Sequence, residues 1–114
     1  MSEITPEFIE SEIAMGKKYT MVFLKKGPNR DHDEKTANEI QMAHLKHLFS
    51  LRQKGILLIN GPILDDNEIR GVGIYNLVNK DEVLAIASAD PAVKAGRLVV
   101  EVHEWFGQPG ASLK

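Results

Sequence analysis

The sequence contains no cysteine, which excludes disulfide bonds, zinc–thiolate sites and thiol nucleophiles together. It also has no apolar run that approaches the ~20 residues needed to span a bilayer. Residues 1–18 lack the apolar stretch of a signal peptide. We therefore expect no membrane partner and a cytoplasmic location, unless a leader peptide precedes the sequence.

An excess of charge of either sign is also missing. The 14 Lys and Arg residues nearly balance the 16 Asp and Glu residues, for a formal net charge of −2. Without a broad basic field the chain has no means of holding a phosphate backbone, so we expect no nucleic-acid partner. The apolar and charged fractions, 43% and 26%, are typical of a globular protein. At 114 residues we expect a single domain over residues 1–114 with one hydrophobic core.

Three pairs of residues have the pattern of a helix start, with a capping side chain followed by a proline or a glutamate at a fixed offset. These pairs are Thr5 with Pro6, Asp31 with Glu34, and Asn79 with Glu82. The helices that they predict cover residues 6–15, residues 32 or 33 to 54, and residues 79–87.

Segments rich in β-branched and aromatic residues, bounded by turn residues, predict strands. These strands cover residues 19–24, 56–60, 69–77 and 98–104. Without the first helix, the order of elements is β-α-β-β-α-β, which predicts a ferredoxin-like α+β fold. We expect a four-stranded antiparallel sheet in the order 4-1-3-2, two helices on one face, and an extra N-terminal helix.

The strands are apolar on both sides, although two helices can cover only one face of the sheet. Met21 and Phe23 point opposite to Val22 and Leu24, whereas a sheet with one wet face alternates apolar and polar residues. Monomers seldom leave such a patch in water. The N-terminal helix is one candidate cover, and a second copy of the chain is the better one, so we expect a homodimer of the dimeric α+β barrel type.

His44 is the first candidate for chemistry, because helical periodicity places it in an apolar stripe with Ile40, Leu48 and Leu51. A histidine in such a place is either a core residue bonded to backbone or a general base tuned by burial and a carboxylate neighbour. His44 and His47 have a spacing that suits a metal, but two histidines are too few for a site. We expect no metal.

Asp90 precedes a proline, where an aspartate commonly caps exposed backbone amides. The alternative is that its carboxylate forms a hydrogen bond with a histidine, which the spacing of residues along the sequence does not show by itself. Gly61 and Pro62 end a strand, and a strand glycine can mark the close approach of a ligand. Together with Arg97 they are the predicted substrate-binding residues. By charge alone, Arg97, Lys94 or Arg30 would hold an anionic group.

The pattern resembles the YCII-related domain family over about residues 19–106, which leaves residues 1–18 as a helical extension. The first half of the resemblance lies in His44, Leu45, Leu51, Gly55, Ile56, Leu57, Gly61 and Pro62. The second half lies in the segment from Ala89, Asp90 and Pro91 through Ala95 and Gly96, and in Val100, Glu101, Val102 and Trp105.

The resemblance implies a ferredoxin-like fold that dimerises, and a histidine and aspartate that form a dyad in a pocket, here His44 and Asp90. One activity in the family removes hydrogen chloride from a chlorinated aromatic intermediate and needs no cofactor. The first helix and residues 25–33 depart from the family pattern, which puts the substrate class in doubt.

Two functions fit these observations. The first is a cofactor-independent lyase or isomerase for a small organic molecule, in which His44 removes a proton and Asp90 orients the ring. The second is a non-enzymatic dimeric module that binds a small metabolite or supports a partner protein. A relative of the ferredoxin-like monooxygenases is a weaker third. The two leading functions differ in whether His44 and Asp90 share an open pocket or a closed core contact.

Overall fold

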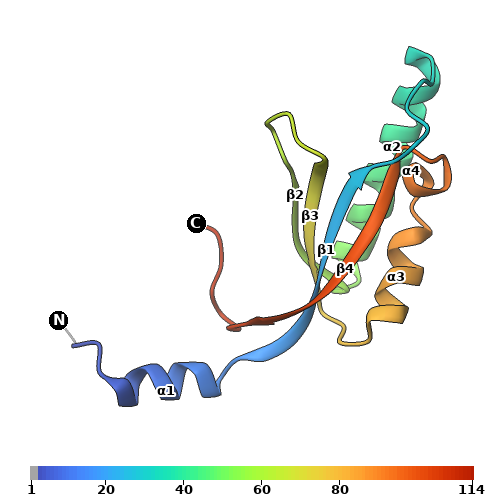
Figure 1. The fold of residues 1–114 in the computed structure, drawn as a ribbon. Helices are drawn as coiled ribbons and strands as arrows, with labels where there is room; N and C mark the ends of the chain where they lie inside the picture. The colour runs from blue at the N-terminus through green and yellow to red at the C-terminus, as the bar shows by residue number, and fades with distance from the viewer. Residues whose placement is uncertain (1–2) are drawn as a thin grey trace.

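The computed structural model describes residues 3–114. Its helices are α1 (Pro6–Ala14), α2 (Glu34–Gln53), α3 (Lys80–Ser88) and α4 (Pro91–Lys94). Its strands are β1 (Lys17–Lys26), β2 (Leu57–Pro62), β3 (Ile69–Tyr75) and β4 (Leu98–Gly107). The strands form one antiparallel sheet in the order β2-β3-β1-β4. The chain therefore has the predicted ferredoxin-like α+β architecture, with β1 and β3 at the centre of the sheet (Figure 1).

Two of the predicted helix starts are confirmed and one is wrong. The Thr5 hydroxyl accepts a hydrogen bond from the Phe8 amide, and the Asn79 side chain accepts one from the Glu82 amide. The long helix, however, is capped by Asp33, whose carboxylate accepts from the Thr36 amide at 2.7 Å. Asp31 lies too early, because the extended backbone continues through Asp33 before the first helical turn.

The core fills the space between the sheet and the helices. Its buried members come from both layers: Val22, Leu48, Leu51, Leu57, Tyr75, Val83 and Ala87. Thr20 is fully buried in the same layer, and its hydroxyl donates to the Leu77 carbonyl at 2.8 Å. That bond satisfies a polar group which would otherwise be costly to bury.

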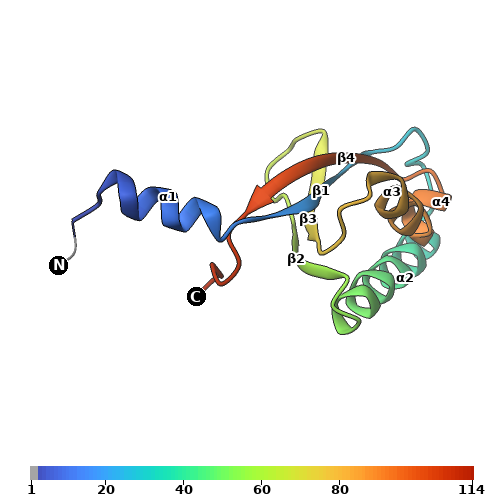
Figure 2. The same ribbon diagram turned by 90° about the horizontal axis from the view of Figure 1, so that it is seen from below.

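α1 does not cover the second face of the sheet, so that alternative is wrong. None of its residues is buried, and it projects from the body of the protein at one end of the sheet (Figures 1 and 2). It is carried on a two-stranded ribbon, since β1 and β4 pair from Lys17 with Gly107 onward, whereas β3 joins β1 only from Thr20. The two strands are thus longer than predicted at this end.

The face of the sheet opposite the helices, here called the bare sheet face, stays apolar. It carries the side chains that alternate with the core residues: Met21, Phe23, Val72, Ile74, Val99 and Trp105. Val99 and Trp105 are 42% and 40% exposed, and no helix among residues 3–114 packs on this face. His103 also lies here, with its ring 5.6 Å from that of Phe23.

Candidate active site

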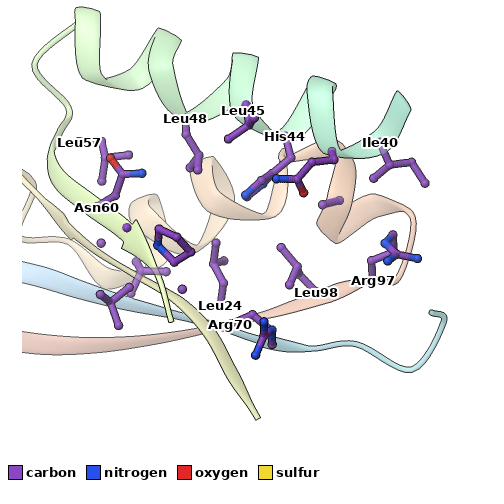
Figure 3. Close-up of a pocket in the computed structure, with 18 of the residues that line it drawn as sticks. Leu24, Ile40, His44, Leu45, Leu48, Leu57, Asn60, Arg70, Arg97 and Leu98 are labelled. Carbon is purple, nitrogen blue, oxygen red and sulfur yellow. The ribbon is translucent and has the colours of Figure 1, made fainter. Parts of the chain in front are cut away.

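A cavity of about 300 Å³ lies between α2 and the sheet (Figure 3). Its floor is the helix-facing side of β3, where Gly71 and Gly73 alternate and leave bare backbone beneath the helix. A β-carbon at Gly73 would lie 3.1 Å from the Leu57 side chain, and one at Gly71 would lie 3.4 Å from the Gly61 carbonyl oxygen. The space exists because these two positions carry no side chains.

The cavity has mainly apolar walls with a few polar groups. The apolar part includes Val22, Leu24, Ile40, Leu45, Leu48, Leu57, Ala92 and Leu98. The polar part comprises Arg30, Gln41, His44, Asn60, Arg70, Tyr75 and Arg97. An apolar pocket with a few converging polar groups is the usual form of a small-molecule site.

His44 points from α2 into this cavity, as the helical stripe predicted (Figure 3). Its side chain is 12% exposed, and its Nδ1 lies 2.5 Å from Oδ2 of Asp90. The structure therefore brings the two residues into hydrogen-bond contact at the wall of an open pocket. A closed core contact would have had no cavity beside it.

Asp90 serves both of the uses considered for it, one with each oxygen. Oδ1 accepts from the Ala92 amide at 2.8 Å and caps α4, whose first residue is Pro91. Oδ2 is then left to face His44. The side chain is only 2% exposed, so two hydrogen bonds and a fixed backbone hold the carboxylate in one orientation.

Tyr75 is a cavity residue that the sequence reasoning missed. It ends β3 on the same side as Gly71 and Gly73, and only 3% of it is exposed. Burial, and secondly the charge of Asp90, raise the pKa of its phenol to about 12. The phenol therefore stays protonated at neutral pH. The raised pKa means that the protonated phenol stabilises the folded state. This contribution to the free energy of unfolding is fully present below about pH 10 and is lost as the pH rises through about 12.

Of the three cations considered for an anionic group, Arg97 and Arg30 line the cavity and Lys94 does not, and Arg70 lines it as well. Arg97 has a guanidinium nitrogen 3.1 Å from Nδ1 of His32. Arg30 donates to the backbone carbonyl of Arg97, and Arg70 donates to the carbonyls of Asp65 and Asn67. Burial, followed by the neighbouring charges of Arg97 and Arg70, lowers the pKa of Arg30. Regular alternation along β3 would place Arg70 on the face opposite Gly71 and Gly73, and it lies where the pairing of β1 with β3 is irregular, so no signal in the sequence indicated its place in the cavity.

Gly61 and Pro62 lie at the end of β2, on the cavity wall. The neighbouring Asn60 was not predicted. Its side-chain oxygen is buried and has no hydrogen-bond partner among residues 3–114. Within the same residues, no group of three or more His, Asp or Glu side chains is placed to hold a metal ion. No helix in this range is both long and apolar enough to cross a bilayer.

Residues 19–106 match the model of the YCII-related domain. The chain belongs to the YCII-related domain family. This YCII-related chain is also similar to a solved structure, the 5-chloro-2-hydroxyhydroquinone dehydrochlorinase TftG from Burkholderia phenoliruptrix AC1100, in complex with 2,5-dihydroxybenzoquinone. The TM-score is 0.56 at 23% identity, over 75% of this chain and 92% of TftG. At that identity the likeness establishes the shared fold. No curated protein matches the chain.

Proposed function

We propose that this protein is a cofactor-independent enzyme of the lyase or isomerase type, in which His44 and Asp90 act as a general-base pair on a small organic molecule. The observation that carries the proposal is the 2.5 Å contact between His44 Nδ1 and Asp90 Oδ2 at the wall of a cavity of about 300 Å³. That volume is at the lower end for ligand pockets and suits a molecule with a single ring.

The contact also favours one state of the histidine. A carboxylate only accepts hydrogen bonds, so in the neutral imidazole the proton resides on Nδ1. Nε2 then carries the free lone pair and can remove a proton from a carbon next to an activating group. Asp90 stabilises the imidazolium that forms, without itself taking the proton.

The remaining steps differ between the two reaction types. In a lyase, the electron pair left by the proton forms a double bond and expels a leaving group from the neighbouring carbon. In an isomerase, the imidazolium returns the proton to a different carbon. General-base catalysis contributes about 10²–10⁴-fold, so the cavity must also fix the geometry of the substrate.

The solved neighbour supports this choice of chemistry. TftG is named as a dehydrochlorinase, which removes a proton and a chloride, and its structure holds a six-membered ring compound. Both fit a histidine base beside a small cavity. The non-enzymatic metabolite-binding module would use the same cavity without needing an oriented base.

The proposal is tested with the compounds that the neighbour names. We expect 2,5-dihydroxybenzoquinone to bind in calorimetry, and halogenated hydroquinones, including 5-chloro-2-hydroxyhydroquinone, to release halide in the presence of the protein. Binding without turnover of any member of such a set would favour the binding module. If none of these compounds binds or is turned over, the proposal that the protein is an enzyme of this type is wrong.

Filling the floor of the cavity should remove ligand binding without unfolding the protein. In Gly71→Leu the new side chain projects toward Leu24 into space that is now empty. Its backbone is compatible with a side chain, because only Gly55, Gly96 and Gly110 among residues 3–114 have positive φ. We expect a circular dichroism spectrum like that of the parent, and at least ~10-fold weaker binding of 2,5-dihydroxybenzoquinone. Unchanged affinity would place the ligand elsewhere.

We further propose that the protein forms a homodimer through the bare sheet face. A second copy fits because this face is apolar and carries side chains of both positive and negative charge. Lys25 Nζ lies 3.9 Å from the Glu101 carboxylate, and His103 lies 3.5 Å from the same carboxylate. A two-fold related copy offers the same mixture in return.

The dimer is tested at the middle of that face. Ile74 pairs with Met21 on one side and Ile59 on the other, so Ile74→Lys places a charge in the centre of the contact. Light scattering at micromolar concentration should give a dimer for the parent and a monomer for Ile74→Lys. Leu64→Lys is the matched control, because Leu64 is 92% exposed and lies in a loop. A parent monomer would refute the dimer.

A further inference from the structure

Three arginines from separate parts of the chain converge on the cavity. Arg30 comes from the connection between β1 and α2, Arg70 from β3, and Arg97 from the turn before β4. In Figure 3, Arg97 lies toward one end of the cavity and Asn60 and Leu57 toward the other, whereas Arg70 lies on the strand side, across from His44. Residues so far apart in sequence meet here only through the tertiary fold.

No carboxylate of residues 3–114 forms an ion pair with any of these arginines. The ion pairs within residues 3–114 involve lysines and histidines, and none includes an arginine. The hydrogen bonds of Arg30 and Arg70 go to backbone carbonyls. Arg97 contacts the ring of His32. These contacts fix the guanidinium groups in place but do not cancel their charge.

The nearest acidic side chains are otherwise engaged or lie outside the cavity. Asp66 pairs with Lys26 at 3.5 Å and is 97% exposed. Asp65 borders a separate shallow hollow next to Arg30 and Arg70. Glu68 raises the pKa of Arg30 less than Arg97 and Arg70 lower it. The local excess of positive charge is notable in a chain whose net charge is −2.

The rest of the wall strengthens the effect of this charge. Leu24, Ile40 and Leu98 line the cavity near the arginines, and charges act over a longer range beside apolar walls than in water. Guanidinium groups match carboxylates in geometry and can bind them through two parallel hydrogen bonds. The Asp90 carboxylate lies behind His44, so the cavity is positive at the arginines and negative behind the base.

We propose that Arg30, Arg70 and Arg97 form an anion subsite, and that the molecule which this cavity binds is a single-ring organic acid. Its carboxylate lies against the arginines and its ring extends toward His44. This inference rests on the proposed function in one respect, since it names the substrate class of the same site. The anion subsite itself does not require catalysis.

The test compares two probes of the same shape, 2,5-dihydroxybenzoate and its uncharged amide, 2,5-dihydroxybenzamide, in which an NH2 donor replaces one carboxylate oxygen. We expect the acid to bind at least ~10-fold more tightly than the amide, as a hydrogen-bonded charge contributes in a partly desolvated site. Added salt should weaken binding of the acid more than that of the amide. Equal affinities, or no measurable binding of either probe at millimolar concentration, would overturn the anion subsite.

Variants then locate the effect. Arg70→Gln and Arg97→Gln should each remove most of the preference for the acid, and Arg70→Lys should restore part of it because the charge remains. Arg52→Gln is the matched control, since Arg52 lies on α2 over the ring of Phe49 and outside the cavity. Loss of preference in Arg52→Gln as well, or full preference in both cavity variants, would overturn the assignment.

A further variant separates this inference from the proposed function. His44→Asn should keep the arginine-dependent preference for the acid over the amide, because that preference arises where the carboxylate lies against the arginines. An arginine-dependent preference for the acid, together with no turnover of any compound in the set, would refute the enzyme and leave the anion subsite standing. Halide release without preference for the acid would support the enzyme and refute the anion subsite.

Discussion

Replacing His44 by asparagine should lower the rate of halide release by about 10²–10⁴-fold, the usual contribution of a general base. Asparagine is chosen because its amide nitrogen takes nearly the position of Nδ1 and can still donate to Asp90 Oδ2. The buried carboxylate thus keeps its partner, and the variant loses only the basic nitrogen. The melting temperature should therefore change little compared with the rate.

The control for this variant is the neighbouring histidine. His47→Asn removes an imidazole from the same helix one turn further along, from a residue that does not line the cavity. It should keep the parent rate, whatever it does to stability. If His44→Asn retained the parent rate, or if both variants lost it equally, His44 would not be the base.

The second large effect is expected at Asp90, where two substitutions separate capping from catalysis. In Asp90→Ala both hydrogen bonds of the carboxylate disappear, to the Ala92 amide and to His44. Losing a helix cap and leaving a buried donor unpaired should destabilise the fold by about 2–4 kcal/mol. Chemical denaturation would measure this loss directly.

Asp90→Asn should instead keep the fold and lose the activity. Its single oxygen is needed by the Ala92 amide, so the amide nitrogen must face His44. A nitrogen donor in that place forces the histidine proton onto Nε2 and removes the lone pair from the cavity. A wrong tautomer of this kind costs about 10⁴-fold in a serine protease triad.

The tautomer can be observed without any substrate. ¹⁵N NMR of the histidine rings should show His44 protonated on Nδ1 in the parent protein and on Nε2 in Asp90→Asn. Halide release should fall in parallel. Full activity in Asp90→Asn, with the cap retained, would mean that Asp90 serves only to cap α4.

Local sequence signals predicted much of this fold because each has a local physical cause. Thr5 and Asn79 cap their helices through side chains that reach amides three residues ahead, which needs no tertiary contact. The strand order followed from the succession of elements. The prediction of Asp31 as the helix cap was wrong because Asp33, two residues later, can cap a helix in the same way. Only the path of the preceding chain determines which of the two aspartates is used.

The candidate site was predictable in part for similar reasons. Helical periodicity alone placed His44 toward the sheet, whereas its partner Asp90 was identified through the family resemblance. Tyr75 was missed, since its strand register shows that it shares a face with Gly71 and Gly73 but not that these glycines hollow out a cavity there. Arg70 was missed because regular alternation would place it on the opposite face, and the pairing of β1 with β3 becomes irregular only at this residue. The position of α1 depends on how far β1 and β4 remain paired, and no local signal marks that end.

We propose that this protein binds and transforms its substrate in the cavity beside His44 and Asp90. A crystal structure at saturating 2,5-dihydroxybenzoquinone tests it most directly. We expect the ring between α2 and β3, with a ring atom within about 3–3.5 Å of His44 Nε2 and an oxygen toward the arginines. A ligand bound elsewhere, or a cavity that stays free of ligand at saturation, would contradict it.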